Sequence, residues 1–183
     1  MRKLSFIFAL LGSSAAASGL EIDVVGAHTE GTITIDLLED VAPNHVAQIT
    51  ALAADGFYNG VYFHRVIDGF MAQTGDGEFG RIDGNTLQRA GTGGSDLGNI
   101  DAEFSEIPFE RGVVGMARSQ NPDSANSQFF IMFADGPFLN GDYTVVGRVT
   151  AGLDVLDDIK RGDSSTLRTT GEPDHMAEVR VTQ

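Results

Sequence analysis

The chain of 183 residues contains no cysteine and no tryptophan, and it has only 12 lysine and arginine residues against 26 aspartate and glutamate residues. Without cysteine there is no disulfide, no thiol nucleophile and no thiolate metal site, so packing alone must hold the fold. A formal net charge of -14 repels phosphate backbones and anionic lipid headgroups. We therefore expect neither nucleic acid nor a membrane surface as a partner.

Long apolar runs are also scarce. One run, over residues 4–11, follows a basic pair and precedes small residues that end at Ala17. This order is typical of a secretory signal, and the run is shorter than the roughly 20 apolar residues that a membrane-spanning helix needs. We expect a signal peptide over residues 1–17, cleaved near Ala17, and one exported domain, periplasmic or secreted, over residues 18–183. A frayed or buried N-terminal helix is the alternative interpretation.

Short alternating runs fill most of the remaining chain. Ile33, Ile35 and Leu37, for example, alternate with polar residues, which is typical of a half-buried strand. We expect eight strands, over residues 20–25, 31–38, 61–67, 70–73, 112–117, 128–133, 144–149 and 177–182. Helical spacing predicts one helix after Pro43 and another over residues 152–160. Many short strands with two helices indicate a mainly β domain, either an antiparallel barrel or a sandwich.

Residues 75–98 differ from the rest, because eight of these 24 residues are glycine. A loop of this length inside a compact domain is uncommon and often functional. The spacing of its acidic residues Asp76, Glu78 and Asp83 does not match a calcium-binding loop. We expect a solvated loop here, with a metal site as the weaker alternative.

The familiar catalytic motifs are missing from the sequence. It contains no G-x-S-x-G, no H-E-x-x-H and no Walker loop, and its four histidines lack metal-ligand spacing. We therefore expect no metal and no cofactor. A hydrolase that uses Ser or Asp stays open as an alternative, since triad members can come from anywhere in a chain.

Three blocks carry a more specific pattern: FHRVIDGFMAQTGD over residues 63–76, GVVGMARSQNPDSANSQFFIMF over 112–133 and GPFLNGDYTVVGRV over 136–149. In this order they resemble the cyclophilin family of peptidyl-prolyl cis/trans isomerases, and the resemblance runs from about Leu20 to the C-terminus. The pattern looks more like that of bacterial exported members than that of eukaryotic ones. It implies a closed eight-stranded antiparallel β-barrel capped by two α-helices, and an isomerase that assists the folding of exported, proline-containing polypeptides. A non-catalytic peptide-binding chaperone module on the same fold is the alternative.

The resemblance also implies roles for individual residues. Arg65 would direct a hydrogen-bond donor at the prolyl nitrogen, and Gln73 would hold the substrate backbone beside it. The substrate-binding residues would be Phe70, Met71, Ala117, Arg118, Phe130, Phe138, Leu139 and Tyr143. Many eukaryotic members carry Trp where this chain has Phe138 and His where it has Tyr143. These departures leave the isomerase core intact but weaken the expectation of tight cyclosporin binding.

Plainer roles apply to neighbouring residues. Phe129 and Ile131 are expected in the core, and Phe130 on the opposite face of the same strand. Alternation points His64 away from the face of Arg65, which favours a structural role. Asp76 is expected at a strand end or in a loop. We expect a monomer, because a peptide groove needs no second subunit.

Overall fold

The structure is a computed structural model that describes residues 18–27, 29–163, 166, 168–169 and 171–183. The expected signal peptide, residues 1–17, lies outside the described residues. Within the described ranges, no helix has the length and apolar character that crossing a bilayer requires.

The described residues form nine strands and two α-helices, joined by turns and loops. The strands are β1 (Gly19–Val25), β2 (Glu30–Leu37), β3 (Val61–Tyr62), β4 (Arg65–Ile67), β5 (Met71–Thr74), β6 (Val113–Met116), β7 (Phe129–Met132), β8 (Val145–Ala151) and β9 (His175–Thr182). The helices are α1 (Pro43–Ala54) and α2 (Leu153–Asp158), with short 3-10 turns at Leu87–Arg89, Pro122–Ser124 and Pro137–Leu139.

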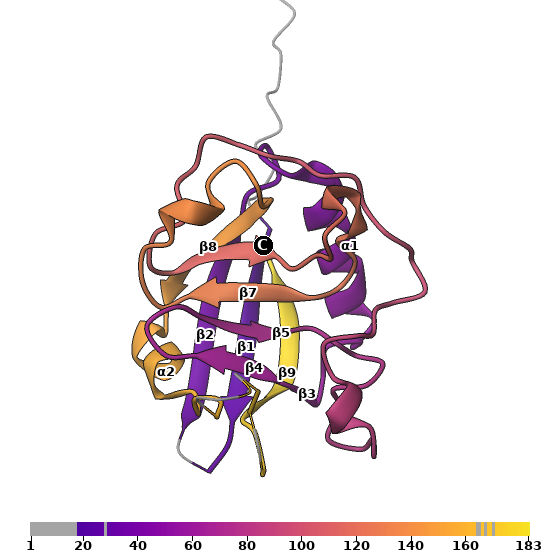
Figure 1. Cartoon of the computed structure of the whole chain (residues 1–183), viewed down its shortest axis with the longest axis vertical. Coiled ribbons are helices and arrows are strands. Elements are labelled where there is room, and N and C mark those ends of the chain that lie inside the picture. The colour runs from indigo at the N-terminus through magenta and orange to yellow at the C-terminus, as the bar shows by residue number, and fades with distance from the viewer. Residues whose placement is uncertain (1–17, 28, 164–165, 167, 170) are drawn as a thin grey trace, which may run out of the picture.

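All nine strands belong to one sheet, in the order β3-β9-β1-β2-β8-β6-β7-β5-β4. Every pair within it is antiparallel. The sheet curls on itself, so that β4, β5 and β7 cross in front of β1, β2 and β9, while α1 lies to one side (Figure 1). The predicted mainly β, antiparallel barrel architecture with two α-helices is confirmed, with nine strands where eight were expected.

The additional strand arises because the predicted strand over residues 61–67 is interrupted. The backbone N–H of Phe63 donates to the Asp174 carbonyl, and the His64 carbonyl accepts from the Thr169 N–H. The backbones of these two residues therefore form hydrogen bonds with Asp174 and Thr169 and not with a neighbouring strand of the sheet. The interruption separates β3, which pairs with β9, from β4, which pairs with β5.

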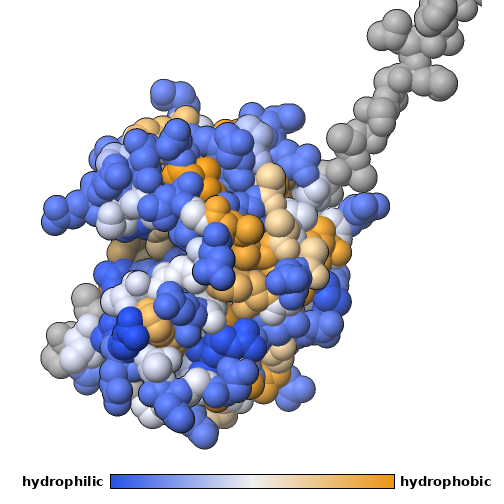
Figure 2. All heavy atoms as spheres, turned by 90° about the vertical axis from the view of Figure 1, so that its right-hand side faces the viewer, coloured by the Kyte–Doolittle hydropathy of each residue, from blue (hydrophilic) through white to orange (hydrophobic). Residues whose placement is uncertain are grey.

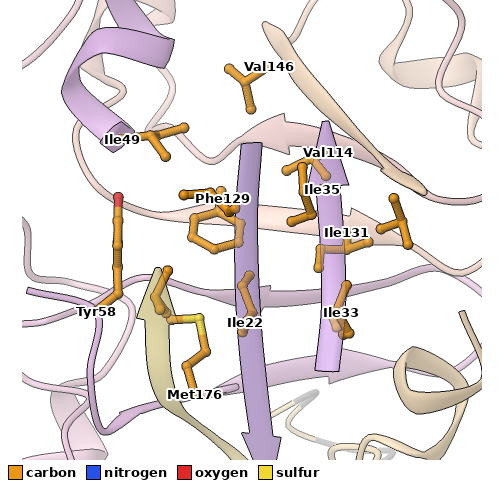
Figure 3. Packing of buried hydrophobic residues seen from close by; sticks show 14 of the residues in the cluster. Ile22, Ile33, Ile35, Ile49, Tyr58, Val114, Phe129, Ile131, Val146 and Met176 are labelled. Atoms are coloured by element: carbon orange, nitrogen blue, oxygen red, sulfur yellow. The ribbon is translucent and has the colours of Figure 1, made fainter. Parts of the chain in front are cut away.

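The inner core lies between the two crossing parts of the sheet and α1. Side chains from both layers meet there, including Ile22, Ile33 and Ile131 (Figure 3). Fully burying one such side chain contributes roughly 1.5–3 kcal/mol, so this cluster supplies most of the driving force for folding. Outside the core, hydrophilic residues cover most of the face on the side of α1, and hydrophobic ones gather in patches (Figure 2).

Helix α1 is fixed at its start by a carboxylate from a distant loop. Pro43 occupies the first turn, where its missing N–H costs nothing. The side chain of Glu103 accepts hydrogen bonds from the backbone N–H groups of Asn44, at 3.1 Å, and His45, at 3.0 Å. Two of the donors that a helix N-terminus leaves unpaired are thus satisfied, and the loop around Glu103 is held against the helix.

Candidate active site

Strand β7 supplies side chains to both faces of the sheet. Phe129 and Ile131 lie in the inner core, whereas Phe130 and Met132 belong to a second hydrophobic cluster on the outer face. This division follows from the alternation of side chains along a strand. The prediction that Phe130 faces away from Phe129 and Ile131 is confirmed.

A cavity of about 410 Å³ opens on this outer cluster. It combines a guanidinium, an amide and several apolar or aromatic side chains. Its lining residues are Arg65, Phe70, Met71, Gln73, Ala117, Arg118, Phe130, Phe138, Leu139 and Tyr143. The structure thus brings together all ten residues that the sequence predicted for the site. Their individual roles in a reaction stay predictions.

The floor and the rim of the cavity differ in burial. Met71, Phe130 and Leu139 are almost completely buried and form the floor. Phe138 is 67% exposed and lies at the rim, where its ring centroid is 5.3 Å from that of Phe70. The floor is therefore held by its own packing, whereas the rim is free to adapt to a bound apolar group.

The guanidinium of Arg65 is positioned by the pairing of β4 with β5, which places Arg65 directly opposite Gln73. Its Nη1 donates to Gln73 Oε1 at 3.2 Å and lies 4.0 Å from the Met71 sulfur. Partial burial lowers the pKa of Arg65, and nearby Tyr143 opposes that effect. An arginine starts so far above neutrality that it stays charged. Among the described residues, its Nε and Nη2 groups have no protein acceptor, which leaves donors for a ligand.

Gln128 is a site residue that the sequence reasoning missed. Its Oε1 accepts from Gln73 Nε2 at 3.0 Å, and its own Nε2 donates to the Gly93 carbonyl at 2.8 Å. Gln128 lies two residues before Phe130, immediately ahead of β7. Extending the alternation of Phe130 by one step would have placed Gln128 on the same face of the strand.

One wall of the cavity is built by Arg118 and Tyr143. The Arg118 guanidinium carbon lies 4.3 Å from the centre of the Tyr143 ring, and Nη2 donates to the Asp142 carbonyl at 2.8 Å. The Tyr143 ring in turn meets Phe130 edge-on, with 5.9 Å between centroids. A cation over an aromatic face contributes about 0.5–1 kcal/mol at exposed sites, so the wall is held by several modest contacts.

A second hollow, of about 850 Å³, adjoins the first, because both are lined by Gln73, Ala117 and Arg118. Its other side is formed by the glycine and polar residues of the 91–96 segment. The first, smaller cavity is the better candidate for chemistry, because only it has a buried apolar floor beside a guanidinium. The second extends the groove along which a longer ligand could lie.

His64 and Asp76 flank the site sequence without lining the cavity. His64 is buried, as its expected structural role requires, and burial, the largest cause, lowers its pKa to about 4. Asp76 follows β5, as expected for a strand-end residue, but it is completely buried. The expectation of a merely solvated loop over residues 75–98 is therefore wrong at its start, where this carboxylate accepts hydrogen bonds from four backbone N–H groups.

The arrangement can donate hydrogen bonds to a group held beside an apolar hollow. The part of the chain that the structure describes contains no group of three His, Cys, Asp or Glu side chains placed to hold a metal ion. The residues that line the cavity include no hydroxyl nucleophile paired with a base. Such a site suits a reaction in which an amide is twisted or polarised without breaking a covalent bond.

Comparison with known proteins gives a consistent answer. Residues 22–181 match the family model described as cyclophilin type peptidyl-prolyl cis-trans isomerase. A relative in Brucella suis, named probable peptidyl-prolyl cis-trans isomerase, is 54% identical over 92% of this chain and 86% of its own length. A Helicobacter pylori peptidyl-prolyl cis-trans isomerase is 42% identical over 73% of this chain and 78% of its own.

Solved structures show the same fold. A cyclophilin from Hirschia baltica matches with a TM-score of 0.71 and 27% identity, over 88% of this chain and 73% of its own. A Cryptosporidium parvum cyclophilin type peptidyl-prolyl cis-trans isomerase matches with a TM-score of 0.75 and 26% identity, over 92% of this chain and 99% of its own. The latter was also solved in the presence of the dipeptide Ala-Pro, with a TM-score of 0.74 and 26% identity over 90% and 99% of the two chains.

Proposed function

The chain belongs to the cyclophilin-type peptidyl-prolyl cis-trans isomerase family, with that family's isomerase activity, and we propose that Arg65 and Gln73 carry the reaction in the 410 Å³ cavity. The proposed substrates are other exported proteins. The observation that carries this proposal is the position of Arg65. Its guanidinium lies beside Gln73 and Met71, over the apolar floor and open to solvent.

The reaction needs a hydrogen-bond donor because of the electronic structure of the X–Pro bond. Rotation must break amide resonance against a barrier of about 18–20 kcal/mol, which takes tens to hundreds of seconds without a catalyst. In the twisted state the lone pair returns to the prolyl nitrogen. A donor directed at that nitrogen therefore stabilises the transition state more than either planar ground state. Arg65 supplies such a donor without any proton transfer.

Arg65 alone does not account for a fast enzyme. Raising the rate from about 0.01 to about 1000 per second requires roughly 7 kcal/mol. A hydrogen bond to a charged group contributes about 1.5–3 kcal/mol. The remainder must come from holding the two sides of the bond separately: the proline ring on Met71, Phe130 and Leu139, and the peptide backbone on Gln73.

The substrate backbone extends from the cavity along the second hollow. Ala117 and Arg118 follow β6 at the shared wall of the two hollows, and an extended peptide can pair there in the manner of an added strand. We therefore take proline-containing polypeptides as the substrates. The Ala-Pro dipeptide named for the Cryptosporidium parvum structure supports this choice.

The proposal of export rests on residues 1–17, which combine a basic start, a short apolar run and small residues ending at Ala17. We propose a periplasmic or secreted monomer of residues 18–183 that accelerates proline-limited folding of other exported proteins. Cell fractionation with mass spectrometry tests this. The mature mass should correspond to cleavage near Ala17, and the protein should leave the cytoplasm. A full-length mass confined to the cytoplasmic fraction would contradict it.

The catalytic roles are tested by Arg65→Ala in a protease-free assay of cis/trans relaxation. We expect kcat/KM to fall by about 10- to 150-fold, with an unchanged circular dichroism spectrum. Arg180→Ala is the matched control, because it removes a guanidinium that pairs with Asp23 on β1 and lies outside both hollows. If folded Arg65→Ala retains full turnover, the role of Arg65 is refuted. Peptide binding by the native chain without any turnover would favour a non-catalytic chaperone module.

A further inference from the structure

A buried carboxylate outside the cavity is connected to Arg65 through the backbone of Gly93 and a series of hydrogen bonds. We propose that Asp76 is a positioning residue for the isomerase reaction, and that it acts on Arg65 through the Gly93 carbonyl and the amides of Gln128 and Gln73. This inference rests on the proposed role of Arg65. We call this series of four groups, from Asp76 through Gly93 and the two glutamines, the amide relay.

The first step of the relay is the hold of Asp76 on the glycine-rich segment. Its Oδ2 accepts from the N–H groups of Gly91, at 2.6 Å, and Gly93, at 2.9 Å. Its Oδ1 accepts from Phe79, at 2.9 Å, and Glu78, at 3.2 Å. Bonds to an ionised carboxylate are roughly twice as strong as neutral ones. Asp76 is completely buried, so water does not compete for them.

The sequence of the segment fits this hold. Gly91 has a φ of 92°, in the region that favours glycine. A side chain at Gly93 would place its Cβ only 2.4 Å from Asp76 Oδ1. A larger residue would therefore push the Gly93 peptide off the carboxylate. The Gly93 N–H and C=O belong to adjacent peptide groups joined at the Gly93 Cα, so the hold of Asp76 on the N–H positions the carbonyl through the backbone.

The second step runs from that carbonyl to the guanidinium. Gln128 Nε2 donates to Gly93 O at 2.8 Å, Gln73 Nε2 donates to Gln128 Oε1 at 3.0 Å, and Arg65 Nη1 donates to Gln73 Oε1 at 3.2 Å. A backbone carbonyl can only accept and a guanidinium can only donate. Both ends therefore impose the same direction on the two amides.

This shared direction gives the relay its function. If the Gln128 amide rotated by 180°, its oxygen would face the oxygen of the Gly93 carbonyl, and its NH₂ would face the NH₂ of Gln73. Gln73 could avoid the second clash only by rotating its own amide. Gln73 would then have to present NH₂ to Arg65, donor against donor. With the direction fixed, Gln73 Oε1 stays aimed at Arg65, and the half-buried guanidinium keeps one orientation over the apolar floor. A donor that is already oriented needs no rearrangement during the reaction.

A purely structural role for Asp76 is the competing explanation, and the segment has other attachments that allow the two to be separated. The Asn126 side chain accepts from the Ser95 N–H at 2.8 Å and donates to the Gly98 carbonyl at 2.8 Å. The Thr86 hydroxyl donates to the Phe79 carbonyl at 3.1 Å. The segment is therefore held even where the relay is interrupted at Gln128.

The experiment combines Asp76→Asn with Gln128→Met, which keeps the length of the side chain and removes its amide. NMR exchange on a proline-containing tetrapeptide gives kcat and KM per folded enzyme, and the Nε–Hε signal of Arg65 reports its orientation. Each single variant should lower kcat by about three- to tenfold with little change in KM, and should shift or broaden that signal. Thr86→Ala is the control for a lost loop hydrogen bond, with kcat within about twofold of the native value.

The double variant decides between relay and structural support. If Asp76 acts through Gln128, adding Asp76→Asn to Gln128→Met should lower kcat by less than a further factor of about two. Losses that multiply would overturn the relay, as would an unchanged Arg65 signal in both singles. If Asp76→Asn does not fold, Gly93→Ala takes its place, since it displaces the same carbonyl. An inactive Arg65→Ala with unaffected Gln128→Met refutes only the relay, whereas a fully active Arg65→Ala refutes the proposed function and the relay together.

Discussion

The two hydrophobic clusters of this protein are built from the same kinds of residue and differ in what covers them. The inner cluster, around Ile22, Ile33 and Ile131, is closed between the crossing layers of the sheet and α1 (Figure 3). The outer cluster, around Met71, Phe130 and Leu139, has no second layer over its cavity, and polar groups border it. Covered apolar surface stabilises the fold, whereas uncovered apolar surface beside a fixed donor is available to a substrate.

The same truncation, made once in each cluster, tests whether the two clusters differ in this way. Ile131→Ala and Leu139→Ala each remove three carbons from a buried side chain. Ile131→Ala should lower the free energy of unfolding by about 2–5 kcal/mol, because a closed core cannot refill the space. The kcat/KM of the folded fraction should stay within about twofold. Urea unfolding and the relaxation assay measure the two quantities.

Leu139→Ala should lower kcat/KM more, and the free energy of unfolding less, than Ile131→Ala. Because its cavity is open to solvent, the loss of stability should be smaller than for Ile131→Ala, at about 1–2 kcal/mol. The substrate would lose part of its apolar floor, so kcat/KM should fall by about tenfold. If Leu139→Ala costs as much stability as Ile131→Ala and leaves kcat/KM unchanged, the outer cluster is simply a second core.

The pH dependence separates stability from turnover in a similar way. Burial holds the pKa of folded His64 at about 4, below its ordinary 6.5. Between these values the unfolded chain binds a proton that the folded ring does not. The stability contribution is complete above pH 6.5 and declines as the pH falls to about 4, by about 3 kcal/mol. The carboxylate of Asp23, whose pKa the Arg180 hydrogen bond lowers, affects stability only at still lower pH.

Turnover should instead be flat from about pH 6 to 9, because no acid or base titrates in the proposed reaction. Urea unfolding at intervals between pH 4 and 7, run beside the relaxation assay, measures both profiles. His64→Leu is the control, and it should make the stability profile shallower over this range, with the remaining slope due in part to His175, whose pKa burial also lowers. A bell-shaped activity profile would support a hydrolase, and an unchanged stability slope in His64→Leu would remove His64 as the cause.

The smallest effects are expected at the rim. Phe138 is 67% exposed and contacts Phe70 with 5.3 Å between ring centroids. Phe138→Ala should therefore change stability by less than about 0.5 kcal/mol. A bound proline would lose one flanking aromatic contact, so peptide Kd should weaken by about three- to fivefold. Calorimetric titration measures this, and a loss of folding in this variant would show that the rim belongs to the core.

The sequence predicted more of the fold than of the site. Alternation placed Ile33, Ile35 and Leu37 in the core and separated Phe130 from Ile131, because burial on one face enforces a period of two. The break at Phe63 was missed, since its backbone bonds to Asp174, far along the chain. Such long-range hydrogen bonds leave no local pattern in a sequence.

The site was predicted by resemblance more than by pattern. Spacing alone would have assigned Phe70 and Met71 to an ordinary core, and only the family signature joined them to residues of the 117–143 region. Gln128 was recoverable from the parity of Phe130. The role of Asp76 was not recoverable, because the sequence does not distinguish an aspartate that is buried against backbone N–H groups from one in a solvated loop.

In the proposed mechanism, Arg65 stabilises the twisted amide and contributes little to substrate binding. NMR titration and exchange measurements on Arg65→Ala, with one proline-containing peptide, give Kd and the catalysed exchange rate from the same sample. We predict a Kd within about threefold of the native value and an exchange rate lower by about 10- to 150-fold. A Kd weakened by as much as the rate falls would contradict the claim, since Arg65 would then only hold the substrate.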